Sequence, residues 1–383
     1  MSGKGRKWRV AVVYERFTSV GGAERFCLET CRYLSGLEDF ELTVVCGEVV
    51  DCLPGIRFIE VGVCSFPRML KKNRFVKRVQ AVLKRERFDL VHSHQQLPGT
   101  HCISLHGAPH GIWTRQIQNK KRLSGLDRRI VGLEQETFAH PSLKAVFPVS
   151  TLVHQLYGSL YELGNKQVYI TPPAVDAGWL DEDAFCPEIR SVARERFGFT
   201  QDDVVVTFVA MNWSHKQLDF LMKVVAVVQE EATVPVRLLV AGKGDEEKYG
   251  RKAKALGIEV AFAGVERERL KEVYAAGDIF ALPSKWDAFA MVVVEAMAAS
   301  MPVLISAETG ARDVVEEGVT GFVVGQADVA TWSEILALLI EDTDLRSKTG
   351  RAARATAESF AWKSTSERIA AAWRETLGEC PGG

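Results

Sequence analysis

The chain of 383 residues is 47 % hydrophobic and 25 % charged, with 48 basic side chains set against 49 acidic ones. This composition argues against extensive disorder, and the length exceeds that of one ordinary core, so about two domains are expected. The longest apolar runs fall well short of the roughly 20 residues that span a bilayer, and the polar residues 1–9 precede only a strand-length apolar run. We therefore expect a cytoplasmic protein without a membrane-spanning helix or a secretory signal.

The first half of the chain begins with a strand-like apolar run over residues 9–14. The glycine pair at 21–22 predicts a turn, and an amphipathic helix is expected over residues 23–37. Short β-rich runs over residues 41–46 and 90–92 continue the series. Strands that alternate with helices in this way favour a parallel sheet.

A strongly basic segment lies between two of these strands. Residues 68–87 hold nine basic side chains and one acid, Glu86. Apolar residues such as Phe75 and Val79 fall on one face, which predicts an amphipathic helix. Its basic side suits phosphorylated saccharides or anionic lipid headgroups. The alternative is a helix that packs on the fold and leaves its charges in solvent.

The same order of elements repeats in the second half. A strand over residues 204–210, a helix over 218–230 and a strand over 236–241 predict a second doubly wound unit. The stretch between the halves, 171–187, contains two consecutive prolines and an acidic cluster, which suit an interdomain linker.

The cysteines and histidines bear on whether a metal site is present. The eight cysteines form no Cys-x-x-Cys pair, and we expect them to be small thiols in apolar cores. Seven of the eight histidines fall within residues 92–154, but no downstream carboxylate or Cys/His pair completes a zinc site. We therefore expect no metal.

The clearest chemical signal is the stretch over residues 283–302. Asp287 stands in a loop after an expected strand, and Glu295 stands eight residues later inside an apolar helix that begins after Phe289. Free amides at the start of such a helix suit a diphosphate or a sugar hydroxyl. The buried Glu295 needs donors, which a ribose diol would supply. The alternative is that Asp287 only caps the helix and that Glu295 is a core acid bonded to the backbone.

This stretch resembles the donor signature of glycosyltransferase family 4, in which two glutamates are separated by seven residues. Asp287 stands in place of the first glutamate, and Glu295 matches the second. The resemblance covers nearly the whole chain and within the family is strongest to the lipopolysaccharide core glucosyltransferases. It implies an α/β protein of the GT-B fold, with two Rossmann-like doubly wound domains facing a cleft.

The resemblance also implies domain roles. We expect an N-terminal acceptor-binding domain over residues 1–171 and a C-terminal donor-binding domain over residues 172–359. A last helix near residues 364–377, within the segment 360–383, should pack back on the first domain.

Further positions follow from the resemblance. Gly21 and Gly22 belong to a loop similar to the family's Gly-Gly-Ala-Glu-Arg loop, and His106 should lie beside the transferred sugar. Lys216 matches the lysine of the family's phosphate clamp, where His215 replaces an arginine and so exchanges a permanent charge for a titratable one. The catalytic candidates are Asp287, Lys216, His215 and His106. The donor-binding candidates are Gly21, Gly22, Gly242, Val265, Ala288, Phe289, Ala290, Met291, Val292 and Glu295. The candidate acceptor or membrane contacts are Lys71, Lys72, Lys77 and Arg78.

The implied reaction moves a hexose from a nucleotide diphosphate sugar, with a UDP-sugar favoured, to a hydroxyl of a saccharide or glycolipid, with the anomeric configuration retained. Lys216, His215 if it is protonated, and the helix amides would stabilise the leaving diphosphate, so no metal or other cofactor is expected. The pathway would be lipopolysaccharide or other cell-surface glycan synthesis, with peripheral contact at the inner face of the cytoplasmic membrane and no nucleic-acid partner. Two alternatives stay open: a degenerate nucleotide-sugar-binding protein without turnover, and another GT-B enzyme such as an epimerase.

Overall fold

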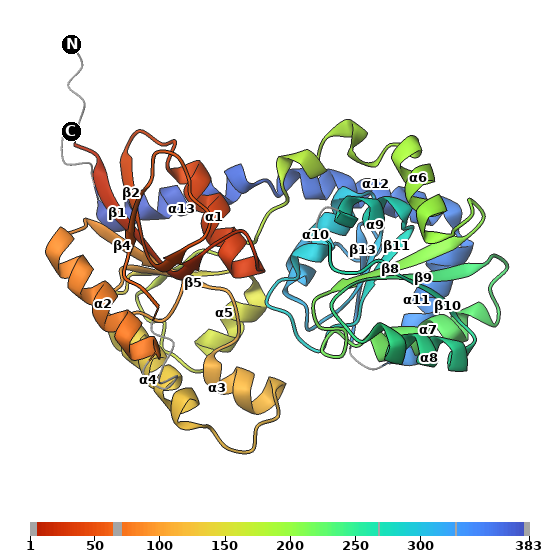
Figure 1. Ribbon diagram of the computed structural model, residues 1–383, viewed down its shortest axis with the longest axis horizontal. Helices are drawn as coiled ribbons and strands as arrows, with labels where there is room; N and C mark the ends of the chain where they lie inside the picture. Colours follow the sequence, from red (N-terminus) through yellow and green to blue (C-terminus); the bar gives the residue numbers. More distant parts are fainter. Residues whose placement is uncertain (1–5, 64–70, 267–268, 326–327, 379–383) are drawn as a thin grey trace, which may run out of the picture. The chain divides into compact units, whose positions relative to one another are not determined.

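The chain divides into two units. The computed structural model describes residues 6–63, 71–266, 269–325 and 328–378. The first unit comprises Met1–Pro173 and Trp362–Gly383, and the second comprises Ala174–Ala361. Within the first unit the last helix, α13 (Trp362–Leu377), packs beside α1 (Gly22–Leu34), so the blue end of the chain lies next to a red helix near its start (Figure 1).

The first unit is built on one parallel sheet. Among the described residues its strand order is β3-β2-β1-β4-β5-β6-β7. The strands are β1 (Trp8–Phe17), β2 (Phe40–Val49), β3 (Arg57–Glu60), β4 (Leu90–Ser93), β5 (Cys102–Leu105), β6 (Ala145–Pro148) and β7 (Gln167–Val168). The remaining helices are α2 (Lys71–Glu86), α3 (His110–Ile112), α4 (Gly125–Ala139) and α5 (Thr151–Gly158), with a π-helical turn at Trp113–Ile117. The strand order reverses between β1 and β4.

The second unit is also built on a parallel sheet. Its described strands follow the order β10-β9-β8-β11-β12-β13. They are β8 (Val204–Ala210), β9 (Val236–Gly242), β10 (Glu259–Phe262), β11 (Ile279–Leu282), β12 (Val303–Ser306) and β13 (Gly321–Val324). The helices are α6 (Pro187–Phe197), α7 (Leu218–Gln229), α8 (Glu246–Leu256), α9 (Leu270–Ala276), α10 (Met291–Ala298), α11 (Val329–Glu341) and α12 (Thr343–Ser359). The expectation of two doubly wound α/β units is confirmed.

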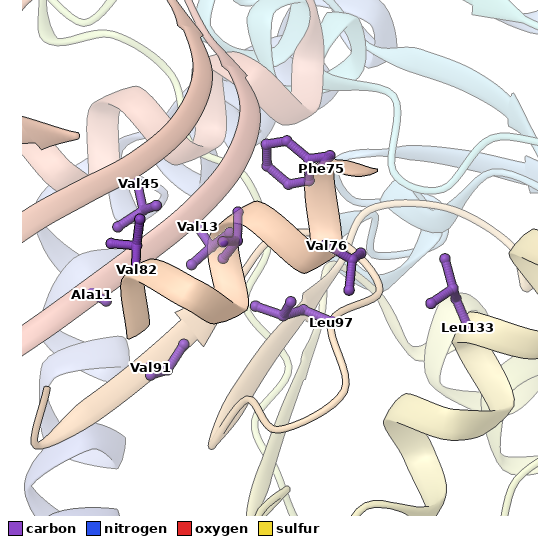
Figure 2. Packing of buried hydrophobic residues seen from close by; sticks show 10 residues of the cluster. Ala11, Val13, Val45, Phe75, Val76, Val82, Val91, Leu97 and Leu133 are labelled. Atoms are coloured by element: carbon purple, nitrogen blue, oxygen red, sulfur yellow. The ribbon is translucent and has the colours of Figure 1, made fainter. Parts of the chain in front are cut away.

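Helix α2 supplies one layer of the core of the first unit. Its side chains at Phe75, Val76, Val79 and Val82 are buried against residues of β1, β2 and β4, and Figure 2 shows several of them turned toward these strands. The apolar face of α2 therefore packs on the sheet, as the alternative for this segment proposed. Burial of the apolar face in the core leaves the basic side of α2 as the side that could meet a phosphorylated saccharide or an anionic lipid headgroup.

Several element ends differ from the prediction. Strand β1 continues to Phe17, beyond the apolar run that predicted it. Arg16 and Phe17 still pair with Glu48 and Val49 of β2. Helix α1 ends at Leu34, three residues early, where the Ser35 and Gly36 amides bond back to the last turn. Of the described cysteines, Cys27, Cys31, Cys46 and Cys102 are buried, but Cys52 is exposed and Cys186 is half-buried. Cys64 and Cys380 lie outside the described residues.

Most of the predicted linker is packed. The division between the units falls after Pro173, and the residues that follow form short 3₁₀ turns at Ala177–Trp179 and Glu182–Phe185. Arg354 of α12 donates to the carbonyl oxygens of Trp179 at 3.0 Å and Leu180 at 2.6 Å. Charged donors to backbone carbonyls are among the stronger hydrogen bonds in proteins, so this stretch belongs to the second unit.

A tryptophan ties α13 to the sheet of the first unit. Trp373 Nε1 donates to His92 Nδ1 at 2.8 Å, although the residues are 281 positions apart. Because an indole nitrogen can only donate, His92 carries its proton on Nε2, which donates to Ser104 Oγ at 2.8 Å. Burial lowers the pKa of His92 to about 3. The ring is therefore a neutral structural bridge at neutral pH.

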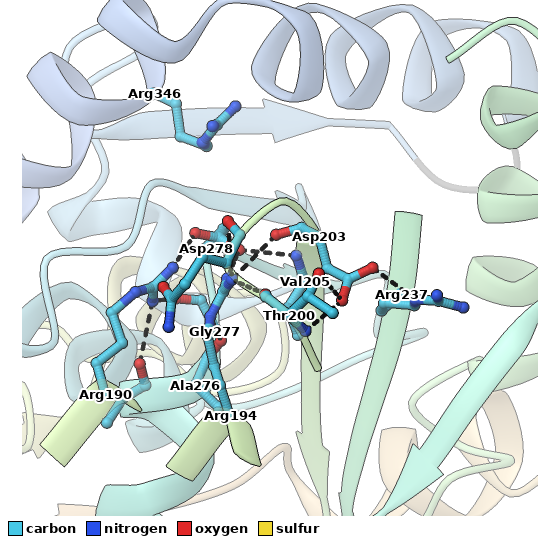
Figure 3. A network of polar contacts seen from close by, with 12 residues as sticks. Arg190, Arg194, Thr200, Asp203, Val205, Arg237, Ala276, Gly277, Asp278 and Arg346 are labelled. Carbon is cyan, nitrogen blue, oxygen red and sulfur yellow. Dashed lines mark hydrogen bonds and ion pairs between the residues drawn. The ribbon is translucent and has the colours of Figure 1, made fainter. Parts of the chain in front are cut away.

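A largely buried ionic network holds the edge of the second sheet at which β8 and β11 begin (Figure 3). Asp278, just before β11, binds the guanidinium groups of Arg190 and Arg194 and accepts from the Val205 amide of β8 at 2.8 Å. Arg194 is 1 % exposed and also donates to the carbonyl oxygens of Thr200 at 2.7 Å and Ala276 at 3.2 Å. Two strands and two helices are thus joined through one guanidinium group.

Replacing Arg194 by alanine should destabilise the second unit by about 3 to 5 kcal/mol, because it leaves a buried carboxylate and several carbonyls short of donors. Urea unfolding should show a transition at lower denaturant. The control is Arg251→Ala on α8, which removes an exposed pair with Glu247 and should change stability by less than about 0.5 kcal/mol. Equal shifts for the two variants would contradict the role given to Arg194.

The His92 pKa predicts a loss of stability in acid. The unfolded chain binds a proton at His92 near pH 6.5, whereas the folded chain does so only near pH 3. Stability should therefore be unaffected by this residue above pH 6.5 and fall by about 1.4 kcal/mol per pH unit below it. In His92→Gln the side chain can still accept from Trp373 and donate to Ser104 but cannot titrate. The slope of unfolding free energy against pH between 6 and 4 should be shallower in this variant, and an unchanged slope would refute the assignment.

Candidate functional site

Two loops of the second unit meet at the carboxyl edge of its sheet, where the strand order reverses between β8 and β11. One follows β8 and spans residues 211–217, and the other follows β11 and spans residues 283–290. We call them the edge loops. Gln217 Nε2 joins them by donating to Pro283 O at 2.8 Å. Ligands of doubly wound sheets bind outside the strand ends at such a reversal, so the edge loops form the expected site.

Lys216 and Asp287 form an ion pair across the edge loops. Lys216 Nζ lies 2.5 Å from Asp287 Oδ2 and 3.2 Å from Trp286 O. Asp287 Oδ1 accepts from the Phe289 amide at 3.2 Å. Both carboxylate oxygens of Asp287 thus have partners, and the lysine charge is fixed at the strand ends. Asp287 does not cap α10, whose N-cap is Ala290, so that alternative is wrong.

His215 lies beside this pair but carries no charge. Its Nε2 is 3.0 Å from the Trp286 carbonyl oxygen, which can only accept, so Nε2 holds the proton. Burial and the adjacent Lys216 lower its pKa below 6.5, despite an opposing effect of Asp287. His215 was expected to help a leaving diphosphate if protonated, and the lowered pKa argues against that charge at neutral pH. The ring instead holds the backbone of the second edge loop.

Helix α10 begins directly after the second edge loop. Its first residue is Met291, one position later than expected, because Ala290 adopts a left-handed conformation with φ of 70°. No side chain caps this end. The Val293 amide donates to Ala290 O at 3.0 Å, so the amides of Met291 and Val292 are the ones that a ligand could bind. Helix α7 begins in the same way, with Gln217 at φ 61° and no side-chain cap. Ala288, Phe289 and Val292 complete the predicted donor segment, with Phe289 buried and the other two half-buried.

Glu295 lies one turn beyond the start of α10 and is 5 % exposed. Tyr274 of α9 donates its hydroxyl to Glu295 Oε2 at 3.0 Å. The carboxylate therefore has a side-chain hydroxyl as a donor. The alternative, in which Glu295 is a core acid, expected donors from the backbone. This arrangement orients the carboxylate and explains how it is tolerated in an apolar helix.

Glycine is required at Gly242, where β9 ends. Its φ is 106°, and a Cβ there would lie 1.9 Å from Ala210 O of the neighbouring strand. The Gly242 amide donates to Gly264 O at 2.7 Å, which brings the loop after β10 to the same edge. Val265, the next residue, is 57 % exposed. Gly242 and Val265 are thus neighbours at the carboxyl edge, as a shared binding role would require.

The first unit contains a pocket of about 430 Å³ at the carboxyl edge of its own sheet. Residues from the end of β1, the loops after β4 and β5, and the start of α2 line it. Among the predicted residues, His106, Lys71 and Lys72 are in this lining. Gly21, with φ of 102°, precedes α1, and Glu24 is the residue of that helix that lines the pocket.

Ion pairs organise the pocket wall. Glu15 receives both Lys71 at 2.6 Å and Lys72 at 2.5 Å, and the pKa of Glu15 is lowered by these lysines against an opposing effect of burial. Arg16 pairs with Glu48 at 3.1 Å. The charged lining is balanced, with Glu15, Glu24 and Glu48 set against Arg16, Lys71 and Lys72, and its positive charge is concentrated at the two adjacent lysines.

The four basic residues predicted together on α2 separate into two pairs. Lys71 and Lys72 face the pocket, whereas Lys77 and Arg78 are exposed and are not among its lining residues. Arg78 donates to Val61 O at 3.0 Å. Arg68, at the start of the predicted basic segment, lies outside the described residues.

Several residues of both sites were not singled out from the sequence. They are Tyr274, which binds Glu295, and Glu15, which binds both lysines; His94, which lies against His106, was noted only among the clustered histidines. Each acts through a contact with a residue distant in sequence, and only the histidine had a local signal, its position after a strand. Within the described ranges no group of three His, Cys, Asp or Glu could hold a metal ion, and no helix is long and apolar enough to cross a membrane.

Models of two known protein families match this chain, one in its first half and one in its second. The model of glycosyltransferase family 4 matches residues 20–179, and that of glycosyl transferases group 1 matches residues 190–356. A D-inositol 3-phosphate glycosyltransferase of Xylanimonas cellulosilytica is 29 % identical over 349 residues, which covers 82 % of this chain and 80 % of the relative.

Solved structures share the fold. WaaG, a glycosyltransferase involved in lipopolysaccharide biosynthesis, superposes with a TM-score of 0.77 at 20 % identity, over 98 % of this chain and all of the other. Anabaena HepE in complex with UDP-glucose gives 0.72 at 18 % identity, over 96 % of this chain and 99 % of the other. Together the two family models match well over half of the chain, one on each unit. The chain therefore belongs to the glycosyltransferases of the GT-B fold that join a family 4 domain to a group 1 domain.

Proposed function

We propose that the protein transfers a hexose from a nucleotide diphosphate sugar, most favourably a UDP-sugar, to a hydroxyl of a saccharide or glycolipid, with retention of the anomeric configuration. The observation that carries the proposal is the group of Lys216, the uncapped start of α10 and the buried Glu295 at the strand reversal of the second unit. A cation, free amides and a carboxylate match the diphosphate and ribose of such a donor. HepE, which has a similar fold, is described in complex with UDP-glucose.

In this mechanism the leaving diphosphate carries the charge that needs stabilisation. Lys216 and the amides of Met291 and Val292 stabilise this negative charge. His215 holds the second edge loop as a neutral hydrogen-bond donor. Asp287, which pairs with Lys216, is the proposed partner of the sugar hydroxyls. We propose that these groups suffice without a metal, in which case turnover persists in EDTA.

The pocket of the first unit is the proposed acceptor site. Its polar lining suits a polyhydroxyl compound, and the adjacent ammonium groups of Lys71 and Lys72 suit one that bears a phosphate. Relatives are named for D-inositol 3-phosphate, and one structural neighbour for lipopolysaccharide biosynthesis. We propose a phosphorylated saccharide, polyol or glycolipid, used in cell-surface glycan synthesis.

One observation favours a second candidate, a nucleotide-sugar-binding protein without turnover. Asp287 offsets the charge of Lys216, and the neutral His215 adds none, so the cluster that would stabilise the leaving group has little net charge. Tight UDP binding without sugar release from any nucleotide sugar would select this candidate.

Glu295 and Lys216 should affect different steps. Glu295→Ala should weaken UDP binding about 10- to 100-fold, because about 1 to 3 kcal/mol of hydrogen bonding is lost. Glu295→Gln can still accept from Tyr274, so its UDP affinity should lie between those of the unmodified protein and Glu295→Ala. Lys216→Ala should lower turnover about 100- to 1000-fold with a smaller change in UDP affinity. Calorimetry with UDP and sugar release from UDP-glucose measure the two effects.

The matched controls are Glu334→Ala on α11 and Lys223→Ala on α7, both exposed side chains of the same unit. Neither should change binding or turnover by more than about twofold. A fully active Lys216→Ala enzyme would overturn the leaving-group assignment, and unchanged UDP affinity in Glu295→Ala would overturn the ribose assignment.

The division of α2 predicts that membrane and acceptor effects separate. Glutamate at Lys77 and Arg78 should reduce sedimentation with vesicles containing anionic phosphatidylserine, because these are the two of the four predicted contacts whose side chains are exposed. Glutamate at Lys71 and Lys72 should instead raise the KM for a phosphorylated acceptor and leave sedimentation unchanged. Vesicle binding that is insensitive to the Lys77 and Arg78 changes would exclude a membrane role for these two residues.

A further inference from the structure

Two histidines face one another in the pocket of the first unit. His94 follows β4 and His106 follows β5, and His94 Nδ1 lies 2.9 Å from His106 Nε2. The rings are within 7° of parallel. Burial lowers the pKa of His106 to about 3 and that of His94 well below its ordinary value. Both rings are therefore neutral near pH 7, and each has one protonated nitrogen.

The surroundings fix the His94 ring. It is 6 % exposed, and the rings of Tyr14, Phe26 and His92 lie 5.9, 6.0 and 5.0 Å from it between centroids. Aromatic contacts on several sides restrict rotation of the imidazole, so Nδ1 stays directed at His106. His106 itself is only half-buried and lines the cavity.

A hydrogen bond between two neutral imidazoles links their tautomers. If His94 donates from Nδ1, His106 Nε2 accepts, and the remaining nitrogen of His106, Nδ1, carries a proton. If His106 donates from Nε2, its Nδ1 is a bare acceptor. The nitrogen that His106 can offer to a ligand is thus Nδ1, and its donor or acceptor character follows from the tautomer of His94.

We propose that His94 is a positioning residue for sugar transfer, which acts by fixing the tautomer and orientation of His106. This inference rests on the proposed function, because it assumes that His106 contacts the substrate. His94 need not touch the substrate. It holds the imidazole of His106 so that Nδ1 presents one polarity to a hydroxyl in the pocket.

Three substitutions test the role. His94→Asn offers an oxygen and an NH₂ group near the former Nδ1 and can serve either tautomer, so turnover should stay within about fivefold of the unmodified enzyme. His94→Leu offers neither and should reduce sugar release from UDP-glucose about 10- to 100-fold, as a misplaced group does. His94→Asp accepts only and should fix the proton on His106 Nε2. UDP affinity should be unchanged in all three, since the proposed nucleotide site lies in the other unit.

The tautomers themselves give a readout that does not depend on turnover. Long-range proton–nitrogen NMR spectra of protein labelled with ¹⁵N-histidine distinguish protonated from bare ring nitrogens. His106 should show one dominant tautomer in the unmodified protein, Nε2–H in His94→Asp, and averaged nitrogen shifts in His94→Leu. The control is His101→Leu, which removes a histidine bonded to the Val91 amide at the opposite end of the same strands and should alter neither His106 nor turnover.

The outcomes separate the two proposals. If the unmodified protein releases no sugar from any donor, the proposed function fails, and the NMR spectra still decide whether His94 sets the His106 tautomer. Identical His106 spectra in the Asp and Leu variants, or full turnover in His94→Leu, would overturn the inference. A merely structural role would give a different result. In that case His94→Leu and His94→Asn would lose UDP affinity, stability and turnover to the same extent.

Discussion

All the described strand pairings in both sheets are parallel, and the rest of the molecule depends on this constraint. Parallel strands place all their carboxyl ends at one edge, and the crossover helices must return the chain along the faces. Where the strand order reverses, two successive loops diverge and leave room for a ligand. The Lys216 and Asp287 pair occupies this place in the second unit, and the pocket with His94 and His106 occupies it in the first. The opposite edge carries the Asp278 network, which holds strands and helices but no candidate site.

The departures from the family pattern act together rather than separately. A histidine in place of an arginine removes a permanent charge, and burial beside Lys216 keeps that histidine neutral. The shorter Asp287 meets the same lysine at 2.5 Å. The Lys216 and Asp287 pair is therefore electrically balanced before a donor arrives, and the charge left over in the edge loops is that of the exposed Lys285. No side-chain cap opposes the dipole at the start of α10. This balance is the physical reason that catalytic strength and nucleotide affinity must be measured separately in this protein.

Helix α2 shows how one amphipathic element can serve three environments. Its apolar side is core, its first two lysines lie in the pocket with Glu15, and its later charges are in solvent. Snorkelling of long basic side chains makes such a division possible on a single helix. A count of basic residues along the segment therefore overstated the surface available to an anionic membrane.

The sequence by itself determined the two doubly wound units, the first strands and helices of each, and the place of the predicted donor segment after β11. Those features depend on local apolar periodicity, on glycines such as Gly242 and on prolines, which act through neighbouring residues. Only the tertiary structure decided that Tyr274 satisfies Glu295, that His215 is neutral, and that His94 holds His106. These three features depend on contacts between residues of different helices, strands and loops, and on burial, which shifts the pKa of a side chain. No local sequence pattern encodes which distant side chain will lie within hydrogen-bonding distance.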